Sequence, residues 1–280
     1  MNTIALYDRV CLKASRNTTA AYSTSFSLGV RSLHERFRDP IHAIYGFVRF
    51  ADEIVDTFHT HDKRALLTRF REDTHRAIAE GISLNPILHS YQNVVRGYGI
   101  ERELYDAFLR SMEMDLHDME HDQRSYETYI LGSAEVVGLM CLRVFCEGDD
   151  ALYQRLKPSA MKLGAAFQKV NFLRDLQDDH QQLGRTYFPG IDVERMSAAD
   201  KCTIEEDIQA DLAAALTGIK ELPKGARFGV YVAYVYYQAL FRKIRALPTD
   251  RILHERIRVR NRYKVALFTT SLLRHSFGML

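Results

Sequence analysis

Apolar residues recur at spacings of three and four along most of this chain, the period of an α-helix with one buried face. Alternation of period two, which is typical of strands, is nearly absent. The helical pattern covers eight segments, 40–57, 63–80, 101–119, 126–146, 159–180, 203–221, 226–247 and 251–275. Glycine and proline number only 15 and 6, and no linker-like stretch interrupts the chain. The sequence therefore predicts a single all-α domain over 1–280, a bundle of roughly eight to ten helices.

Three short patterns predict where helices begin. The pairs Asp-Pro at 39–40 and Asn-Pro at 85–86 each place a capping side chain before a proline at the first helical position. Thr203, followed three residues later by Glu206, is typical of a capping box. We therefore expect helices to start at residues 40, 86 and about 203.

The segment 47–58, FVRFADEIVDTF, carries charged side chains among apolar ones. Tyr45, Arg49, Asp52 and Asp56 follow the rhythm i, i+4, i+7, i+11, which is the rhythm of one helix face. This face overlaps the inward edge of the apolar stripe of the same predicted helix. We therefore expect the two carboxylates and the guanidinium to face the interior of the protein or a cavity.

A second segment, 164–189, repeats this arrangement. Gln168, Asn171, Asp175 and Asp179 fall at i, i+3, i+7 and i+11, which is again one helix face, and again they lie among apolar residues. Each of the two segments thus carries an Asp-x-x-x-Asp pair with an arginine close by. The two arginines are Arg49 and Arg174.

Pairs of carboxylates on an inward face need a cationic partner. Two carboxylates one turn apart repel each other by about 0.2–0.5 kcal/mol on an exposed helix, and removing them from water costs several kcal/mol more. Arginines could compensate as a structural network. Magnesium is the alternative, because it prefers oxygen ligands and takes one or two carboxylates together with phosphate oxygens. Gly-rich phosphate loops are absent, so phosphate chemistry here would rely on metal ions and side chains.

Composition narrows the class of protein further. The formal net charge of +2 is too small to indicate a nucleic-acid partner. The four cysteines show no metal-binding or paired spacing, which predicts a reducing, cytoplasmic location.

The chain begins without a signal-peptide pattern, and its longest uncharged run, 228–241, is short of the ~20 residues that span a bilayer. The basic segment 256–277 either lies on an anionic membrane or forms the charged outer face of a core helix.

The residues around the acidic pairs resemble the squalene/phytoene synthase family, the head-to-head prenyl diphosphate synthases. The second segment carries the family's long signature at Leu163, Gly164, Gln168, Asn171, Arg174, Asp175, Asp179, Arg185, Tyr187 and Pro189. The run 129–140, YILGSAEVVGLM, is similar to the family's Tyr-x-x-Gly-Ser-Ala-x-x-Val-Gly segment, and YSTSF at 22–26 also fits. Tyr237 and Arg256 resemble the family's late tyrosine and arginine, with a longer loop between them.

This resemblance, which covers about residues 20 to 265, implies an isoprenoid-synthase fold with a central apolar cavity. It implies that Mg²⁺, or Mn²⁺, is held by Asp52, Asp56, Asp175 and Asp179. The implied substrate contacts are Ser23, Ser25, Phe26, Arg49, Gln168, Asn171, Arg174, Arg185, Tyr187, Tyr237 and Arg256. Tyr45, Tyr129 and the released diphosphate are the candidate proton acceptors, and Asp115 is an auxiliary candidate. Gly132, Ala134, Gly138, Gly164 and Ala165 either leave room for substrate tails or let helices pack closely.

The implied reaction joins two allylic prenyl diphosphates through a cyclopropylcarbinyl diphosphate. Phytoene from two geranylgeranyl diphosphates is the favoured product, and squalene or dehydrosqualene from two farnesyl diphosphates is the alternative. NADPH is needed only for squalene. A hydrocarbon product suits peripheral membrane contact at its release, and the oligomeric state is open.

Two further alternatives belong to other classes. Head-to-tail prenyl synthases and terpene cyclases share Mg²⁺ and an all-α fold, but they usually show a DDxxD-type motif, whereas this chain has DEIVD and DLQDD. A non-catalytic helical binding protein would pair the same carboxylates with arginine for structural reasons alone.

Overall fold

The computed structural model describes residues 3–117, 122–183, 187–192, 195–252, 257 and 266–272, apart from the side chains of 177–183 and 250. All regular structure in these ranges is helical, so the all-α prediction is confirmed. The helices are α1 (Thr3–Tyr22), α2 (Thr24–Arg31), α3 (Glu35–Asp56), α4 (Lys63–Glu80), α5 (Pro86–Tyr98), α6 (Arg102–Met114), α7 (Gln123–Ile130), the π-helical turn η1 (Leu131–Glu135), α8 (Val136–Cys146), α9 (Asp150–Leu183), α10 (Ala198–Glu221), α11 (Lys224–Arg245) and α12 (Thr249–Ile252). Residues 266–272 are also helical.

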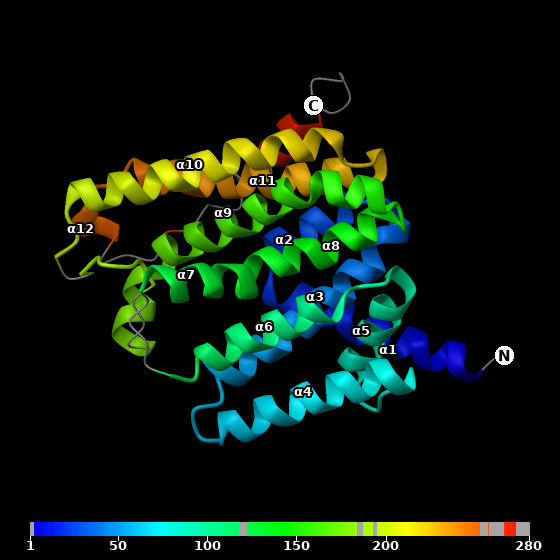
Figure 1. The fold of residues 1–280 in the computed structure, drawn as a ribbon. Helices are drawn as coiled ribbons and strands as arrows, with labels where there is room; N and C mark the ends of the chain where they lie inside the picture. Colours follow the sequence, from blue (N-terminus) through cyan, green and yellow to red (C-terminus); the bar gives the residue numbers. More distant parts are fainter. Residues whose placement is uncertain are drawn as a thin grey trace.

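The helices form a bundle with α9 at its centre. In Figure 1, α10 and α11 lie along one edge of the bundle, α4 lies along the opposite edge, and α7, α8 and α9 run between them. Helix α9 contacts α8, η1, α10 and α11, whereas α3 contacts α1, α5 and α8. The two helices that carry the acidic pairs therefore belong to different neighbourhoods of the bundle.

Only one of the three predicted helix starts is correct. Asn85 caps α5 by accepting hydrogen bonds from the backbone N–H groups of residues 87 and 88, as predicted. Helix α3 instead begins at Glu35, with Pro40 buried inside its first two turns. A proline there removes a single backbone hydrogen bond, and Asp39 pairs with Arg16 (Oδ1 to Nε, 2.7 Å) instead of capping.

Helix α10 begins five residues before its predicted start. Ser197 accepts a hydrogen bond from the backbone N–H of Asp200, and the Asp200 side chain accepts one from the Ser197 backbone, so the two residues form a capping box. Thr203 lies inside the helix, where its hydroxyl donates to the carbonyl of Ala199 at 3.1 Å. A Ser-x-x-Asp box thus takes the place of the predicted Thr-x-x-Glu box.

Helices α1 and α2 were not predicted, because their inward faces lack an apolar stripe. The buried residues of α1 are Cys11, Ser15 and Thr19. These side chains are small enough to bring α1 close to α3, but they do not stand out as hydrophobic in the sequence. Helix α2 is only eight residues long, too short to show a period clearly.

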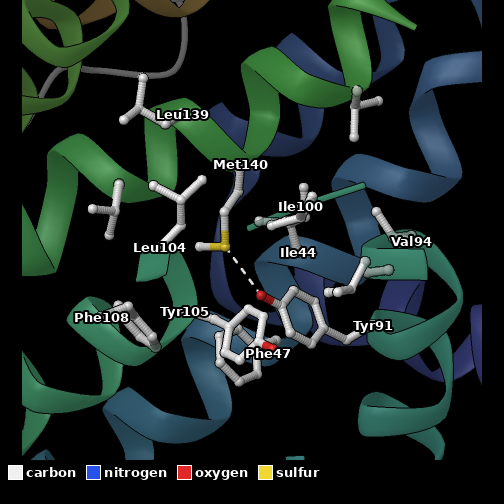
Figure 2. Close-up of a cluster of buried hydrophobic side chains, with 14 of the residues drawn as sticks. Ile44, Phe47, Tyr91, Val94, Ile100, Leu104, Tyr105, Phe108, Leu139 and Met140 are labelled. Carbon is white, nitrogen blue, oxygen red and sulfur yellow. Dashed lines mark hydrogen bonds between the residues drawn. The ribbon is translucent and has the colours of Figure 1, made fainter. Parts of the chain in front are cut away.

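The apolar side chains form two core clusters. The first joins α3, α5, α6 and α8 around Phe47, whose ring stacks on Tyr91 with centroids 3.9 Å apart (Figure 2). The Tyr91 hydroxyl donates to the Met140 sulfur at 3.0 Å. The second cluster joins α7, α9, α10 and α11 and includes Leu173, Ile208 and other buried aliphatic residues.

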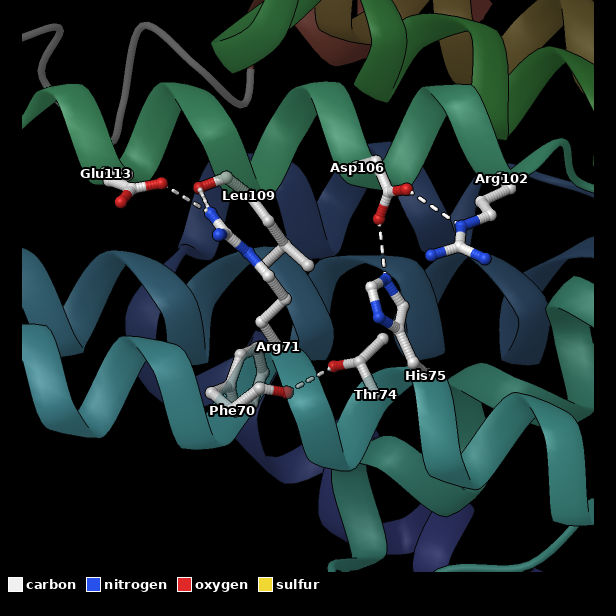
Figure 3. Close-up of polar contacts among 8 residues, drawn as sticks. All are labelled: Phe70, Arg71, Thr74, His75, Arg102, Asp106, Leu109 and Glu113. Carbon is white, nitrogen blue, oxygen red and sulfur yellow. Dashed lines mark hydrogen bonds and ion pairs between the residues drawn. The ribbon is translucent and has the colours of Figure 1, made fainter.

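Polar contacts connect the outer helices to the bundle. Between α4 and α6, Arg71 donates to the carbonyl of Leu109 at 3.2 Å and to Glu113 at 2.9 Å (Figure 3). One turn further along, His75 Nε2 lies 2.6 Å from Asp106 Oδ1. These contacts are partly exposed, so they orient α4 more than they stabilise it.

A buried group of charges connects α9 to α10. Lys169 Nζ donates to Asp211 Oδ2 at 2.7 Å and also to Asp207. Lys162 Nζ lies 2.8 Å from the other oxygen of Asp211. Lys169 and Asp211 are only 7% and 2% exposed. This group fixes how α9 is rotated against α10.

The helical run Gln123–Cys146 is long and apolar enough to cross a membrane, judged by length and composition alone. However, 56% of its most apolar stretch is buried inside the bundle. Core packing therefore accounts for its apolar character. The uncharged run 228–241 lies within α11, which is buried on one side as a core helix.

Candidate functional site

A cavity of about 1130 Å³ lies among α2, α3, α8, α9, α10 and α11. Charged side chains line it near the C-terminal end of α3, at Asp52 and Asp56, and again on α9 at Asp175. The same two helices line it with apolar residues much nearer their N-terminal ends, from Ile41 on α3 and Leu156 on α9. At a rise of about 1.5 Å per residue, Ile41 lies ~17 Å from Asp52 and ~22 Å from Asp56, and Leu156 lies ~28 Å from Asp175. The cavity therefore has a polar end and a long apolar chamber.

Helix α3 presents its predicted face to this cavity. Tyr45, Arg49, Asp52 and Asp56 all line it. The Arg49 guanidinium donates to Asp52 Oδ2 at 3.2 Å and to Glu53. The positive charge that compensates the first acidic pair thus belongs to Arg49, on the same helix as the two aspartates.

A tyrosine outside the predicted set also contacts this arginine. The Arg49 guanidinium lies 4.4 Å from the centre of the Tyr22 ring, a cation–π distance, and Tyr22 also lines the cavity. The signal that could have found Tyr22 is its place as the first residue of YSTSF.

Helix α9 brings the second motif to the same cavity. Gln168, Asn171, Arg174 and Asp175 line it. Arg174 Nε donates to Asp175 Oδ1 at 2.9 Å. The Asn171 amide oxygen accepts a hydrogen bond from the Tyr237 hydroxyl at 3.3 Å. The side chain of the remaining predicted aspartate, Asp179, lies outside the described residues.

The YSTSF stretch spans the junction of α1 and α2, with Ser23 between the two helices. Ser23 caps α2 by accepting a hydrogen bond from the backbone N–H of Phe26 at 3.2 Å. Ser23, Ser25 and Phe26 all line the cavity, and the Phe26 ring stacks on Tyr45 with centroids 4.8 Å apart. Ser23 thus both starts a helix and faces the site.

Aromatic rings form much of the remaining wall. Tyr237 stacks on Phe167 with centroids 3.8 Å apart, and Tyr187 stacks on Phe172 at 3.9 Å. All four line the cavity. The two phenylalanines were not predicted, although both lie within the second acidic segment. Arg185 and Arg256 lie outside the described residues, so their predicted roles stay predictions.

The two tyrosines named as proton acceptors differ in their surroundings. Burial raises the pKa of Tyr45 to about 12, so its phenol holds its proton at neutral pH. The Tyr129 hydroxyl donates to Asp115 Oδ2 at 2.9 Å, and both residues line the cavity. A carboxylate in this position can receive a proton that passes through the phenol. Tyr129 thus has a carboxylate partner within the cavity wall.

The donor atoms at the polar end suit a hard divalent cation. Asp52, Asp56 and Asp175 offer carboxylates, and Gln168 and Asn171 offer amide oxygens. In the described part of the chain, no three His, Cys, Asp or Glu side chains are grouped closely enough to hold a metal ion by themselves. Magnesium commonly binds through one or two carboxylates plus substrate phosphates, so this donor set fits Mg²⁺ bound together with a phosphorylated ligand.

The small residues of η1, α8 and α9 were predicted either to leave room for substrate tails or to let helices pack closely. A Cβ on Gly132 would lie 2.7 Å from the carbonyl oxygen of Ala107, so Gly132 allows close packing against α6. A Cβ on Gly164 would lie 2.6 Å from the carbonyl oxygen of Ala134. Gly164, Ala134 and Gly138 also line the cavity. Close packing and space for a ligand thus coincide at Gly164.

Comparison with known proteins shows where this architecture recurs. The chain matches the family model described as squalene/phytoene synthase over residues 19–263. It is 31% identical over 176 residues to the presqualene diphosphate synthase of Rhodopseudomonas palustris, an alignment that covers 60% of this chain and 59% of that protein. It is 28% identical over 260 residues to the phytoene synthase of Rhodobacter capsulatus, covering 86% of this chain and 75% of that one.

A solved structure extends the likeness to the fold. A dehydrosqualene synthase crystallised with a ligand superposes with a TM-score of 0.83 at 19% identity, covering 96% of this chain and 98% of that one. The predicted all-α isoprenoid-synthase fold is thereby confirmed.

Proposed function

Because this chain belongs to the squalene/phytoene synthase family, we propose that it joins two prenyl diphosphates head to head. The observation that carries the proposal is the division of the cavity. Carboxylates from α3 and α9 line one polar end, and the rest is an apolar chamber. A prenyl diphosphate divides in the same way, with a charged head and a long hydrocarbon tail.

The polar end is suited to removing a diphosphate. When the allylic C–O bond breaks, its electron pair leaves with the diphosphate, so fixed positive charge beside that group lowers the barrier. Arg49 and Arg174 can bind phosphate oxygens through two N–H groups each. The magnesium ligands in this proposal are the aspartates of the two acidic pairs, Asp52, Asp56, Asp175 and Asp179. Bound Mg²⁺ would add positive charge at the leaving group.

The apolar chamber is suited to protecting the allylic cation that remains. Water would add to such a cation, so the walls must exclude it. The stacked pairs of Phe26 with Tyr45 and Phe167 with Tyr237 supply aromatic surface to this wall. The double bond of the second substrate then supplies the electron pair for the new carbon–carbon bond. Loss of a proton gives a cyclopropylcarbinyl diphosphate, and Tyr129 with Asp115 is the acceptor that we propose for this proton.

The substrate length, and whether the reaction stops at this cyclopropylcarbinyl diphosphate or continues, are the finer part of the proposal. Relatives of the chain include presqualene diphosphate synthases and phytoene synthases. Phytoene from two C20 substrates stays the favoured prediction. Presqualene diphosphate from two C15 substrates is the second candidate, because the relative with 31% identity is named for it.

Product analysis tests the proposal directly. The protein is incubated with farnesyl or geranylgeranyl diphosphate and Mg²⁺, with and without NADPH, and the lipid products are identified by mass spectrometry. We expect a head-to-head product from at least one substrate and its loss when EDTA is added. A head-to-tail or cyclised product, or no product from either substrate, would refute the proposal.

A non-catalytic binding protein predicts a different pair of results. In that case Asp52→Ala and Asp175→Ala would destabilise the fold, and Mg²⁺ with inorganic pyrophosphate would leave the melting temperature unchanged. We expect the opposite, because a ligand that binds only the folded state raises its stability. Thermal melts of the wild type and both variants, with and without the two ions, separate the hypotheses.

A further inference from the structure

Arg49 on α3 lies between two carboxylates, one on the cavity wall and one behind it. Its Nη1 donates to Asp52 Oδ2 at 3.2 Å, and its Nη2 donates to Glu53 Oε1. Asp52 lines the cavity, whereas Glu53 is not among the described residues that line it. The Glu53 side chain is nevertheless only 13% exposed. The proposed function gives roles to Arg49 and Asp52 and leaves Glu53 without one.

The position of Glu53 on the helix shows in which direction it draws the arginine. Successive residues of an α-helix are rotated by about 100° around its axis. Relative to Arg49, Asp52 and Asp56 are therefore rotated about 60° and about 20° in one direction. Glu53 is rotated about 40° in the other direction. Its contact thus draws the guanidinium away from the acidic pair.

The contact between Arg49 and Asp52 is a single, long hydrogen bond. Charge-assisted N–H···O bonds are typically about 2.7–2.9 Å long, and an arginine binds a carboxylate most strongly through two parallel bonds. Arg49 makes one bond to Asp52, at 3.2 Å. Its Nε is buried and makes no hydrogen bond to a described residue, so this atom does not supply the second bond. Arg49 thus holds Asp52 weakly.

A weak hold on Asp52 favours a cation that binds the same carboxylate. Mg²⁺ binds carboxylate oxygens, so an arginine paired with Asp52 through two bonds would compete for them. A guanidinium pressed against the metal site would also repel the ion. An arginine drawn towards Glu53 competes less for Asp52 and stays beside the site, where it can bind a phosphate oxygen.

We propose that Glu53 is a positioning residue, which holds Arg49 away from Asp52 so that a divalent cation and the arginine can bind the same diphosphate. Glu53 touches neither the substrate nor the metal and acts through Arg49. No bond is made or broken at Glu53, and no proton is transferred there. This inference rests on the proposed function. The alternative is a structural pair, four residues apart, that only stabilises α3.

A double-mutant cycle of Glu53→Gln and Arg49→Gln tests the inference. Mg²⁺ is titrated at a saturating concentration of inorganic pyrophosphate, and half-saturation is read from the melting temperature, which a ligand of the folded state raises. With Arg49 present, we expect Glu53→Gln to raise the half-saturating Mg²⁺ concentration about 10-fold, because the guanidinium then moves onto Asp52. In the Arg49→Gln background we expect a rise of less than about 3-fold, from the lost charge alone.

Glu113→Gln is the matched control. Glu113 on α6 pairs with Arg71 at 2.9 Å and is not among the described residues that line the cavity. The variant therefore takes a carboxylate from an arginine that is not part of the site, and we expect its Mg²⁺ response to match that of the wild type. If Glu53 forms only a structural pair, Glu53→Gln should behave in the same way as this control.

Kinetics supply a second readout. Excess Mg²⁺ should restore kcat/KM of Glu53→Gln to within about 2-fold of the wild type, but should not restore Asp52→Ala, which lacks a proposed metal ligand. Equal shifts in both backgrounds of the cycle, or no Mg²⁺ response in any of these proteins, would overturn the inference. If the wild type binds Mg²⁺ with pyrophosphate but makes no prenyl product, the proposed function fails, while the cycle still decides the role of Glu53.

Discussion

The two helices that carry the acidic pairs, α3 and α9, reach one cavity from different surroundings. On α3 the positive charge comes from within the helix, since Arg49 pairs with Asp52 and Glu53, one turn further along. On α9, Arg174 pairs with its immediate neighbour Asp175. A second set of charges on α9 faces α10 and connects the two helices.

This difference shows two ways to hold carboxylates at a buried site. Helix α3 balances its polar residues locally, and apolar packing around Phe47 sets its position. Helix α9 is joined to α10 by buried ion pairs, which restrict its rotation. Changes on α3 should therefore affect chemistry more than stability, whereas changes on the α10 side of α9 should affect stability first.

The largest expected effect is on catalysis and is equal for the two helices. Asp52→Ala and Asp175→Ala should each lower kcat/KM by about 10³-fold or more, because each removes a carboxylate that the proposed function uses to place positive charge at the leaving group. Steady-state kinetics with a prenyl diphosphate checks this. Circular dichroism melts serve as the control for folding. A large loss for only one of the two variants would mean that the helices are not equivalent in the reaction.

The second prediction separates the helices by stability. Asp211→Asn removes the buried charge that Lys162 and Lys169 share and leaves Lys169 only its contact with the more exposed Asp207. We therefore expect a cost at the lower end of the about 3–5 kcal/mol that is typical for breaking a buried pair. The matched change on α3 is Glu53→Gln, which leaves Arg49 its contact with Asp52 and should cost less than about 1 kcal/mol. Urea unfolding of both variants measures the difference. Similar costs would contradict the contrast drawn between α3 and α9.

The third prediction concerns how closely α9 approaches the cavity wall. Gly164→Ala would place a methyl group 2.6 Å from the backbone oxygen of Ala134, where no flexible side chain can yield. Overpacking of this kind costs about 1–3 kcal/mol. We expect a lower melting temperature and a weaker response to Mg²⁺ with pyrophosphate. Gly97→Ala, at a site with nothing within 4 Å of the added Cβ, is the control and should change little.

The smallest predicted effect is a pH dependence that comes from α3. Burial, assisted by the nearby arginines Arg16, Arg31 and Arg38, lowers the pKa of His42 from 6.5 to about 4. The unfolded chain therefore binds more protons between these values, and this residue's contribution to stability is lost as the pH falls from 6.5 towards 4. Because His42 is only partly buried, we expect about 1 kcal/mol. Urea unfolding at pH 7 and pH 5 should show this loss in the wild type and less of it in His42→Gln.

The sequence predicted best which side chains share one face of a helix. The positions of Tyr45, Arg49, Asp52 and Asp56 on a single cavity-lining face follow from spacing alone. Helix α1 escaped prediction because Cys11 and other small residues form its inward face. The shape of the cavity depends on how helices distant in sequence pack together, which local spacing does not contain.

The turn η1 is a second feature that the sequence did not reveal. The run YILGSAEVVGLM reads as a continuous helix, and the structure departs from an α-helix at Leu131–Glu135. Gly132 lies against Ala107 and Ser111 of α6 at distances that admit no side chain. The π turn thus occurs where η1 approaches α6 closely, and that approach is a property of the assembled bundle.

Asp56 is the last residue of α3, and this placement has an electrostatic consequence. The aligned peptide dipoles of a helix leave about half a negative elementary charge at its C-terminal end. That partial charge adds to the charges of Asp52 and Asp56 instead of offsetting them. The backbone itself therefore makes this end of the cavity more attractive to cations than its side chains alone would.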